Sequence, residues 1–138
     1  MTISEYTQKI DHLRWLIESK KEKILALEAI ATNTTAALTG MPHNPSSVQS
    51  RMADALLKKL ELENSIREDE ASLQALKEAL GEAIERVSSP KHQAILYKRY
   101  IRNMTIDEIA VEISYSERTA KRLISEANRM LEEVLAAA

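Results

Sequence analysis

The sequence contains no cysteine and no phenylalanine, and it has only two glycines and three prolines in 138 residues. The lack of cysteine excludes a disulfide framework, cysteine-based zinc sites and a thiol nucleophile, and it is compatible with a reducing compartment. So few glycines and prolines leave too few turn formers for a many-stranded sandwich or barrel. The chain is therefore predicted to be all-α.

Aromatic residues make up 4% of the chain, although 44% of it is hydrophobic. The apolar residues are mainly Ala, Leu and Ile, which suits long, narrow contacts between helices better than one thick core. No apolar run approaches the roughly 18 residues that a membrane span needs, and the N-terminal segment lacks the apolar centre of a signal peptide. We expect a cytoplasmic protein that makes no membrane contact.

Two segments show the spacing of a coiled coil, with apolar residues alternately three and four positions apart. The first predicts a helix over residues 4–31, and the second predicts a helix over residues 47–86 that is about 60 Å long at about 1.5 Å per residue. Between them, residues 32–47 contain Gly40 and two prolines, which predicts a long loop. Because neither helix can bury its stripe alone, residues 1–87 are predicted to form a long antiparallel helical hairpin.

The second stripe includes two charged residues, Lys59 and Asp69, and is widened by Leu56, Leu60 and Ile84. Polar groups at such positions fix helix register or oligomeric state, which favours a homodimer formed through the coiled coil. The alternative is that both side chains extend to water. The surplus length of the second helix is expected to pack on another copy or on the C-terminal part.

Residues 88–138 are predicted to form a separate domain. Ser88, Ser89 and Pro90 are predicted to end the long helix and start another, because Ser is a good N-cap and Pro suits the first helical position. Asn103 can adopt the left-handed conformation that ends a helix. Thr105 and Glu108 have the spacing of a capping box, in which the Glu side chain bonds back to the backbone NH of the cap.

A helix, a tight turn and a longer helix are expected over residues 105–131. Ala110 is small enough for a second helix to cross closely, as a helix-turn-helix requires. Ser116 is predicted to cap the second helix. The residues predicted to face inward are Ala120, Leu123, Ala127, either Met130 or Leu131, and Leu135.

The exposed start of that second helix carries side chains suited to base edges in the major groove of double-stranded DNA. Arg matches the guanine acceptors, Lys reaches bases or phosphates, and Thr offers a hydroxyl and a methyl group. Glu117 either accepts from cytosine or serves only the helix dipole. The predicted base contacts are Glu117, Arg118, Thr119, Lys121 and Arg122. The predicted phosphate contacts are Lys98, Arg99, Arg102, Thr105, Ser116, Ser125 and Arg129.

The segment VSSPKHQAILYKRYIRNMTIDEIAVEISYSERTAKRLISEANRMLEEVL resembles region 4 of sigma-70 factors. The resemblance rests on RYIRNMT, on DEIA and on YSERTAKR at the start of the recognition helix. It implies that promoter contacts fall on Glu117, Arg118, Thr119, Lys121 and Arg122, and that bacterial RNA polymerase is a further partner. The rest of the chain lacks an aromatic promoter-melting region, so a complete sigma factor is not expected.

The whole layout resembles the phage-encoded transcriptional regulators of the autolysin regulatory protein (ArpU-like) group. This resemblance implies a regulator of late phage genes in a bacterial host. Two other functions stay open, namely a coiled-coil interaction protein that contacts RNA polymerase and a small terminase-like DNA-binding subunit.

Catalysis and cofactor binding have little support in the sequence. His12, His43 and His92 lie in three different segments without acids or cysteines at metal-ligand spacing. The two glycines, Gly40 and Gly81, cannot form a phosphate-binding glycine loop. We therefore expect no enzyme activity, no metal and no cofactor.

Overall fold

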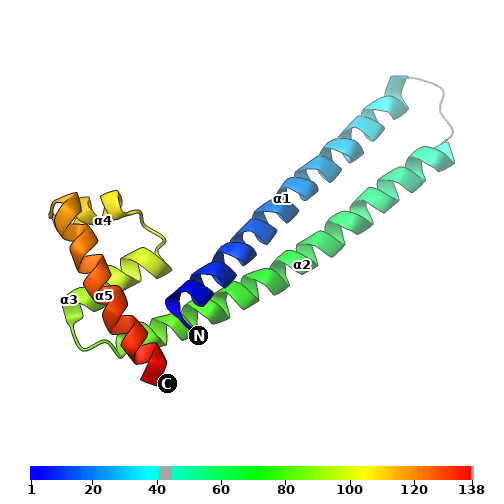
Figure 1. The fold of residues 1–138 in the computed structure, drawn as a ribbon. Helices are drawn as coiled ribbons and strands as arrows, with labels where there is room; N and C mark the ends of the chain where they lie inside the picture. The colour runs from blue at the N-terminus through cyan, green and yellow to red at the C-terminus, as the bar shows by residue number, and fades with distance from the viewer. Residues whose placement is uncertain (41–44, 138) are drawn as a thin grey trace. The chain divides into compact units, whose positions relative to one another are not determined.

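The computed structural model describes residues 1–40 and 45–137, and these residues form helices and no strand (Figure 1). The elements are the helices α1 (Ile3–Gly40), α2 (Pro45–Glu85), α3 (Pro90–Leu96), the π-helical turn η1 (Tyr97–Ile101), α4 (Ile106–Ile113) and α5 (Glu117–Ala137). This order confirms the all-α prediction of a long helical hairpin followed by a helix-turn-helix region.

The chain divides into two compact units. One unit, here called the hairpin unit, is His12–Leu73. The other, here called the C-terminal unit, combines Met1–Asp11 with Gln74–Ala138, so it includes the first turns of α1 and the last turns of α2. The predicted domain boundary at residue 88 remains a prediction.

In the hairpin unit, α1 and α2 run antiparallel (Figure 1). Ile17, Ala55 and Ile66 are buried between the helices. Lys20, at a polar position of the first stripe, donates to Ser65 and pairs with Asp69. The polar groups within the two stripes therefore satisfy each other and fix the register of the hairpin.

The other polar stripe residue, Lys59, also has partners inside the hairpin unit. Its Nζ lies 3.1 Å from Glu28 Oε1 and 3.9 Å from Glu63 Oε1. Leu56 and Leu60 do not widen the buried stripe as predicted, because more than half of each side chain's surface is exposed. Two helices bury only the narrow strip where they face each other, so residues on its flanks stay in water.

The predicted loop over residues 32–47 is wrong at both ends. Helix α1 continues through Thr32 to Gly40, and α2 begins at Pro45. The threonines and asparagine of this segment cost at most about 0.7 kcal/mol each in a helix, while its alanines and leucine favour one, so the helix continues until Gly40. Proline is tolerated in the first helical turn, where its missing NH has no partner to lose. Residues 41–44, including His43, lie outside the described residues.

The last turns of α2 are buried within the C-terminal unit, where Leu80, Ala83 and Ile84, together with Val87 just after the helix, have exposed fractions of 0–3%. The surplus length of α2 is thus used within the chain. Gln93 fastens the connection to α3, because its Nε2 donates to the carbonyl oxygens of Glu85 at 2.8 Å and Val87 at 2.6 Å. Within the same unit, the Ile3 backbone NH donates to Glu132 Oε1 at 2.9 Å.

Across residues 1–40 and 45–137, no helix has the length and apolar character needed to cross a membrane.

Candidate nucleic-acid interface

The segment that leads into the helix-turn-helix begins at a defined cap. Ser89 is the N-cap of α3, with its side chain accepting from the His92 backbone NH, and Pro90 lies at the first helical position. The π turn η1 follows, closed by a bond from the Arg102 NH to the Tyr97 carbonyl at 3.0 Å. Asn103 then takes the left-handed conformation with φ 55°, as predicted. The π turn was not predicted from the sequence, because one widened helical turn produces no distinct spacing of apolar residues.

Helix α4 begins at Thr105, whose hydroxyl accepts from the Glu108 backbone NH at 3.2 Å. The second half of the predicted capping box differs from the structure. The Glu108 carboxylate accepts from the Thr105 hydroxyl at 3.0 Å. One hydroxyl can donate to a carboxylate while it accepts from an NH, so the two side chains bind each other directly.

The turn between α4 and α5 depends on Ser114, which adopts the left-handed conformation with φ 61° and ψ 38°. The Tyr115 NH closes the turn on the Ala110 carbonyl at 3.0 Å. Ser116 then caps α5 as predicted, because its Oγ accepts from the Thr119 NH at 3.2 Å. Local backbone chemistry therefore fixes where α5 begins.

A small apolar core holds α3, α4 and α5 together. Its buried members are Ile95, Met104, Ile109, Leu123 and Ile124, with Ile106 and Ile113 packed against them. The predicted inward positions Ala110 and Ala120 are buried. Of the two alternatives near the end of α5, Leu131 is fully buried and Met130 is half-buried. Because one face of α5 packs against this core, the other face of its first turns is exposed.

The five predicted base-contact residues lie together on those first turns of α5. Glu117, Arg118, Lys121 and Arg122 are exposed, and Thr119 is half-buried with its Oγ1 bonded to the Ser116 hydroxyl at 2.9 Å. Lys121 Nζ lies 3.2 Å from Glu117 Oε1, so Glu117 has an internal partner besides the helix dipole. Within the part of the chain that the structure describes, the Arg118 guanidinium has no hydrogen-bond or ion-pair partner.

The predicted phosphate-contact residues fall into two groups. Ser125 and Arg129 are exposed on α5, while Thr105 and Ser116 are used as helix caps. Arg99 donates from Nη1 to the Met104 carbonyl at 3.0 Å, which supports the loop before α4.

Lys98 and Arg102 share a carboxylate. Lys98 Nζ bonds to Glu112 Oε1, and Arg102 Nη1 lies 2.9 Å from the same oxygen. The hydrogen bond from Lys98 lowers the pKa of Glu112 below its ordinary value, and the bond from Arg102 lowers it further by a smaller amount. Glu112 therefore neutralises part of the positive charge that would face a phosphate.

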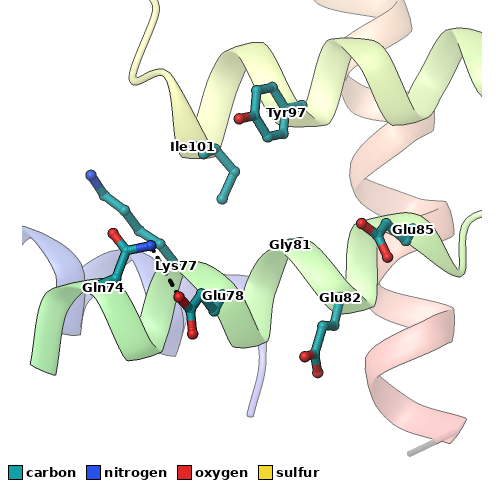
Figure 2. Close-up of a pocket in the computed structure, with 8 residues that line it drawn as sticks. All are labelled: Gln74, Lys77, Glu78, Gly81, Glu82, Glu85, Tyr97 and Ile101. Carbon is teal, nitrogen blue, oxygen red and sulfur yellow. Dashed lines mark hydrogen bonds between the residues drawn. The ribbon is translucent and has the colours of Figure 1, made fainter. Parts of the chain in front are cut away.

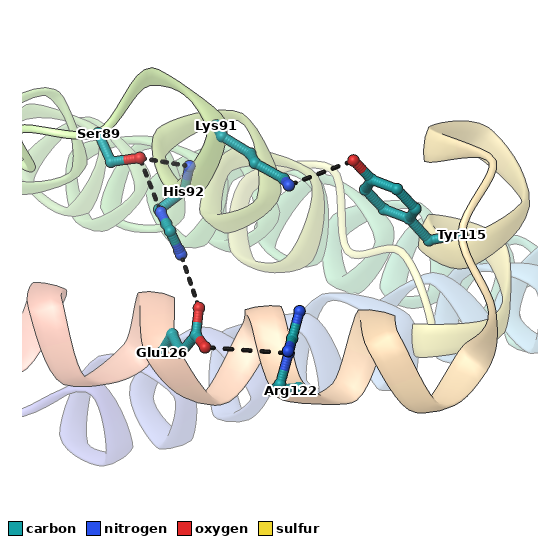
Figure 3. A network of polar contacts seen from close by, with 6 residues as sticks. All are labelled: Ser89, Lys91, His92, Tyr115, Arg122 and Glu126. Carbon is teal, nitrogen blue, oxygen red and sulfur yellow. Dashed lines mark hydrogen bonds and ion pairs between the residues drawn. The ribbon is translucent and has the colours of Figure 1, made fainter.

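Sequence reasoning missed a polar network beside the α5 surface (Figure 3). His92 Nδ1 lies 2.7 Å from Ser89 Oγ, and its Nε2 lies 3.2 Å from Glu126 Oε2. Glu126 Oε1 lies 3.9 Å from Arg122 Nε, so one carboxylate links a predicted base-contact residue to α3. The spacing of Arg122 and Glu126 on one helix face was the available signal.

A second pair in Figure 3 lies at the turn of the helix-turn-helix. Lys91 Nζ donates to the Tyr115 hydroxyl at 3.2 Å and lies 4.8 Å from the centre of its ring. Both residues are exposed. Their cationic and hydroxyl groups suit phosphate oxygens. Neither residue was predicted as a contact, because the two are 24 positions apart and the sequence gives no sign that they meet.

An open groove with an acidic lining runs between α2 and η1 (Figure 2). Its lining includes Glu78, Glu82 and Glu85 from α2, and Tyr97 and Ile101 from η1. The lining also contains one cation, Lys77, but its three carboxylates would repel a phosphate backbone, in contrast to the basic start of α5.

Tyr100 of η1 ties the start of the helix-turn-helix to α5. Its hydroxyl donates to Asn128 Oδ1 at 2.7 Å. Burial raises the pKa of Tyr100, so the phenol keeps its proton and remains a donor.

Residues 89–133 match the family Sigma-70, region 4. No curated protein and no solved structure matches the chain. The matched segment runs from the Ser89 cap through α3, η1, α4 and most of α5, and therefore contains the whole of the apolar core described above. The chain thus carries a helix-turn-helix DNA-binding region similar to sigma-70 region 4.

Proposed function

We propose that this protein is a sequence-specific transcriptional regulator that binds double-stranded DNA through the major groove. The observation that carries the proposal is the exposed cluster of Arg118, Lys121 and Arg122 on the first turns of α5, which starts at a capped, well-packed turn. The N-terminal end of a second helix is the part of a helix-turn-helix that contacts base edges. The match to a DNA-binding regulatory domain supports the same assignment.

Within this surface, Arg118 has the clearest specificity role. Its guanidinium is free of partners among the described residues and can offer two parallel donors to guanine O6 and N7. Lys121 and Arg122 must leave Glu117 and Glu126 before they bind DNA. Both ion pairs are exposed, so breaking them costs at most about 1 kcal/mol each.

The phosphate contacts in the proposal are Lys98, Arg102, Ser125 and Arg129, and the structure adds Lys91 and Tyr115 as candidates. The other predicted phosphate contacts already bond within the free protein: Arg99 donates to a backbone carbonyl, and Thr105 and Ser116 cap helices. Backbone NH groups at the start of α5 can also donate to a phosphate at the positive end of the helix dipole.

We also propose a biological setting. The resemblance of the layout to ArpU-like regulators supports a phage or prophage origin and action in the bacterial cytoplasm, at promoters where RNA polymerase is a second partner. The long hairpin supports association of two copies, which would present two α5 helices to two half-sites.

The test is selection of DNA from a random pool by the purified full chain, followed by binding measurements on the selected site. Arg118→Ala is expected to cost about 1–3 kcal/mol on that site and to relax preference at one base pair. Arg129→Ala is expected to weaken binding to all sequences about equally and to reduce the salt dependence, with about 0.9 of slope for each phosphate contact.

Lys23→Ala is the matched control, because it removes an exposed positive charge from α1 far along the sequence from the proposed surface. It should leave the selected sequence and the affinity unchanged. If the triple variant Arg118→Ala, Lys121→Ala, Arg122→Ala still prefers the selected site, the assignment of α5 is wrong.

A further inference from the structure

His92 of α3 is half-buried, and the proposed DNA contacts do not include it. Its side chain is 13% exposed. One ring nitrogen, Nδ1, lies 2.7 Å from Ser89 Oγ, and the other, Nε2, lies 3.2 Å from Glu126 Oε2 (Figure 3). Both nitrogens therefore have partners, and one partner belongs to α5, the helix that carries the proposed base contacts.

The two partners of His92 specify which nitrogen carries the proton when the ring is neutral. A carboxylate only accepts, so Nε2 must be protonated to bond with Glu126. Nδ1 is then an acceptor, and the Ser89 hydroxyl donates to it while it accepts from the His92 backbone NH. When the ring gains a second proton, Nδ1 donates to Ser89 Oγ and Nε2 still donates to Glu126. Both protonation states thus fit the same positions of the side chains.

Glu126 shares its negative charge between His92 and a predicted base contact. Its Oε1 lies 3.9 Å from Arg122 Nε, one turn earlier on the same face of α5. While His92 is neutral, Arg122 is the cation paired with Glu126. A protonated His92 balances the same carboxylate from a half-buried position, where charges are screened less than at the Arg122 side chain, which is 70% exposed. Arg122 is then more readily available to another anion.

Among the residues that the structure describes, the polar partners of the His92 ring are Ser89 and Glu126 alone. The other charged residues on α3 and on the elements near it are exposed or have partners of their own. They are Glu85, Arg86, Lys91, Lys98, Arg99, Arg129 and Glu133. A charge gained by His92 therefore acts first on Glu126.

We propose that His92 is a positioning residue for DNA binding, which releases Arg122 from Glu126 when its imidazole is protonated. Imidazole is the side chain whose charge ordinarily changes between about pH 5 and 8. The inference rests on the proposed function and deepens it, since it makes the charge of the α5 surface depend on pH. As the pH falls, one positive charge is added beside Glu126, so the affinity for duplex DNA rises.

The test is the affinity of the full chain for its selected duplex, measured by fluorescence anisotropy at constant ionic strength. The wild type is expected to bind about fivefold more tightly at about pH 5.5 than at about pH 7.5, because the exposed pair of Arg122 with Glu126 no longer has to be broken. His92→Gln is expected to bind equally at the two pH values, since an amide gains no charge.

The double variant His12→Gln, His43→Gln is the matched control. It removes the other two histidines of the chain, of which His12 is exposed on α1 and His43 lies outside the described residues. It should keep the whole response to pH. A response lost in this double variant and kept in His92→Gln would overturn the role of His92.

Further variants test whether the response passes through Glu126 and Arg122. Arg122→Ala should bind more weakly and lose the response, because the cation that His92 releases is absent. Arg118→Ala should also bind more weakly but keep the response, since Arg118 is not among the described partners of Glu126. Glu126→Gln should bind at about pH 7.5 as tightly as the wild type does at about pH 5.5. An undiminished response in Arg122→Ala would overturn the route through Glu126.

Circular dichroism melts at both pH values check that each variant folds, and His92→Asn replaces His92→Gln if that variant unfolds. A wild type that binds its selected duplex equally at both pH values would overturn the role of His92 and leave the DNA proposal intact. Failure to select any duplex at either pH would overturn the proposed function and the role of His92 together.

Discussion

The hairpin unit and the C-terminal unit bury their apolar side chains to different depths. Among the hairpin-unit residues whose side chains the structure describes, the most buried, Ala55, Ile17 and Ile66, retain 6–8% exposure. In the C-terminal unit Leu80, Leu96, Ile109 and Leu131 are completely buried. Two helices can cover only one strip of each other, whereas several helices that cross enclose a core from more than one side. Full burial therefore belongs to the part that must hold α5 in a fixed position.

Polar groups differ between the two units in the same way. The Lys20–Asp69 pair lies inside the hairpin stripe with side chains 18% and 17% exposed, and it fixes helix register. Lys98 and Arg102 pair with Glu112 at the surface of the C-terminal unit. There, another negatively charged group can take the place of Glu112. The polar pair in the hairpin thus specifies structure, whereas the pairs in the C-terminal unit neutralise charge at its surface.

The largest expected effect is a loss of stability when a buried leucine of the C-terminal unit is truncated, compared with truncation of a buried isoleucine in the hairpin unit. Leu131→Ala should destabilise the protein by about 2–5 kcal/mol, because it opens a cavity among several helices that cannot close. Ile66→Ala should cost less, since the flanks of the hairpin are open to water and can relax. Urea unfolding followed by circular dichroism measures both. Equal losses would show that the hairpin core is as constrained as the C-terminal one.

An intermediate effect is expected at the Lys20–Asp69 pair. Asp69→Ala should destabilise the hairpin by about 1 kcal/mol, because Lys20 then keeps only Ser65 as a partner in a half-buried site. The combined change Lys20→Met, Asp69→Leu should recover that stability, since apolar residues fill the stripe. Thermal melts of the single and combined variants provide the comparison, and a combined variant less stable than Asp69→Ala would contradict it.

The smallest expected effect concerns Glu112. Because its pKa is lowered, its bonds to Lys98 and Arg102 add stability above its ordinary pKa near 4.5, and this contribution is lost as the pH falls through the lowered value. At neutral pH, Glu112→Gln removes a negative charge beside two cations, so affinity for non-specific DNA should rise a few-fold and its salt dependence should steepen. Glu133→Gln, an exposed acid on α5, is the matched control. Anisotropy titrations at two salt concentrations measure the change.

Several parts of the fold were predictable because they depend on neighbours in the sequence. The alternating three and four spacing located both hairpin stripes. The Ser89, Thr105 and Ser116 caps follow from short side chains that bind a backbone NH two or three residues later. The exposure of the predicted base-contact residues on α5 follows from the same local start. The extent of the hairpin was mispredicted, because threonine and asparagine are weak helix breakers and the preference of flanking residues prevailed.

Contacts between distant positions were decided by the tertiary structure. The sequence could place Lys20 and Asp69 in stripes, but only the antiparallel register made them partners. Likewise, Glu112 lies 14 positions from Lys98 and 10 from Arg102, so its masking of two predicted phosphate contacts depends on how α4 packs beside η1. The sequence by itself determined the helices, their caps and the residues at the start of α5, because these follow from periodicity and local hydrogen bonding. The three-dimensional packing determined which charges are free for DNA and which leucines remain uncovered, because both depend on side chains that meet only after the helices have packed.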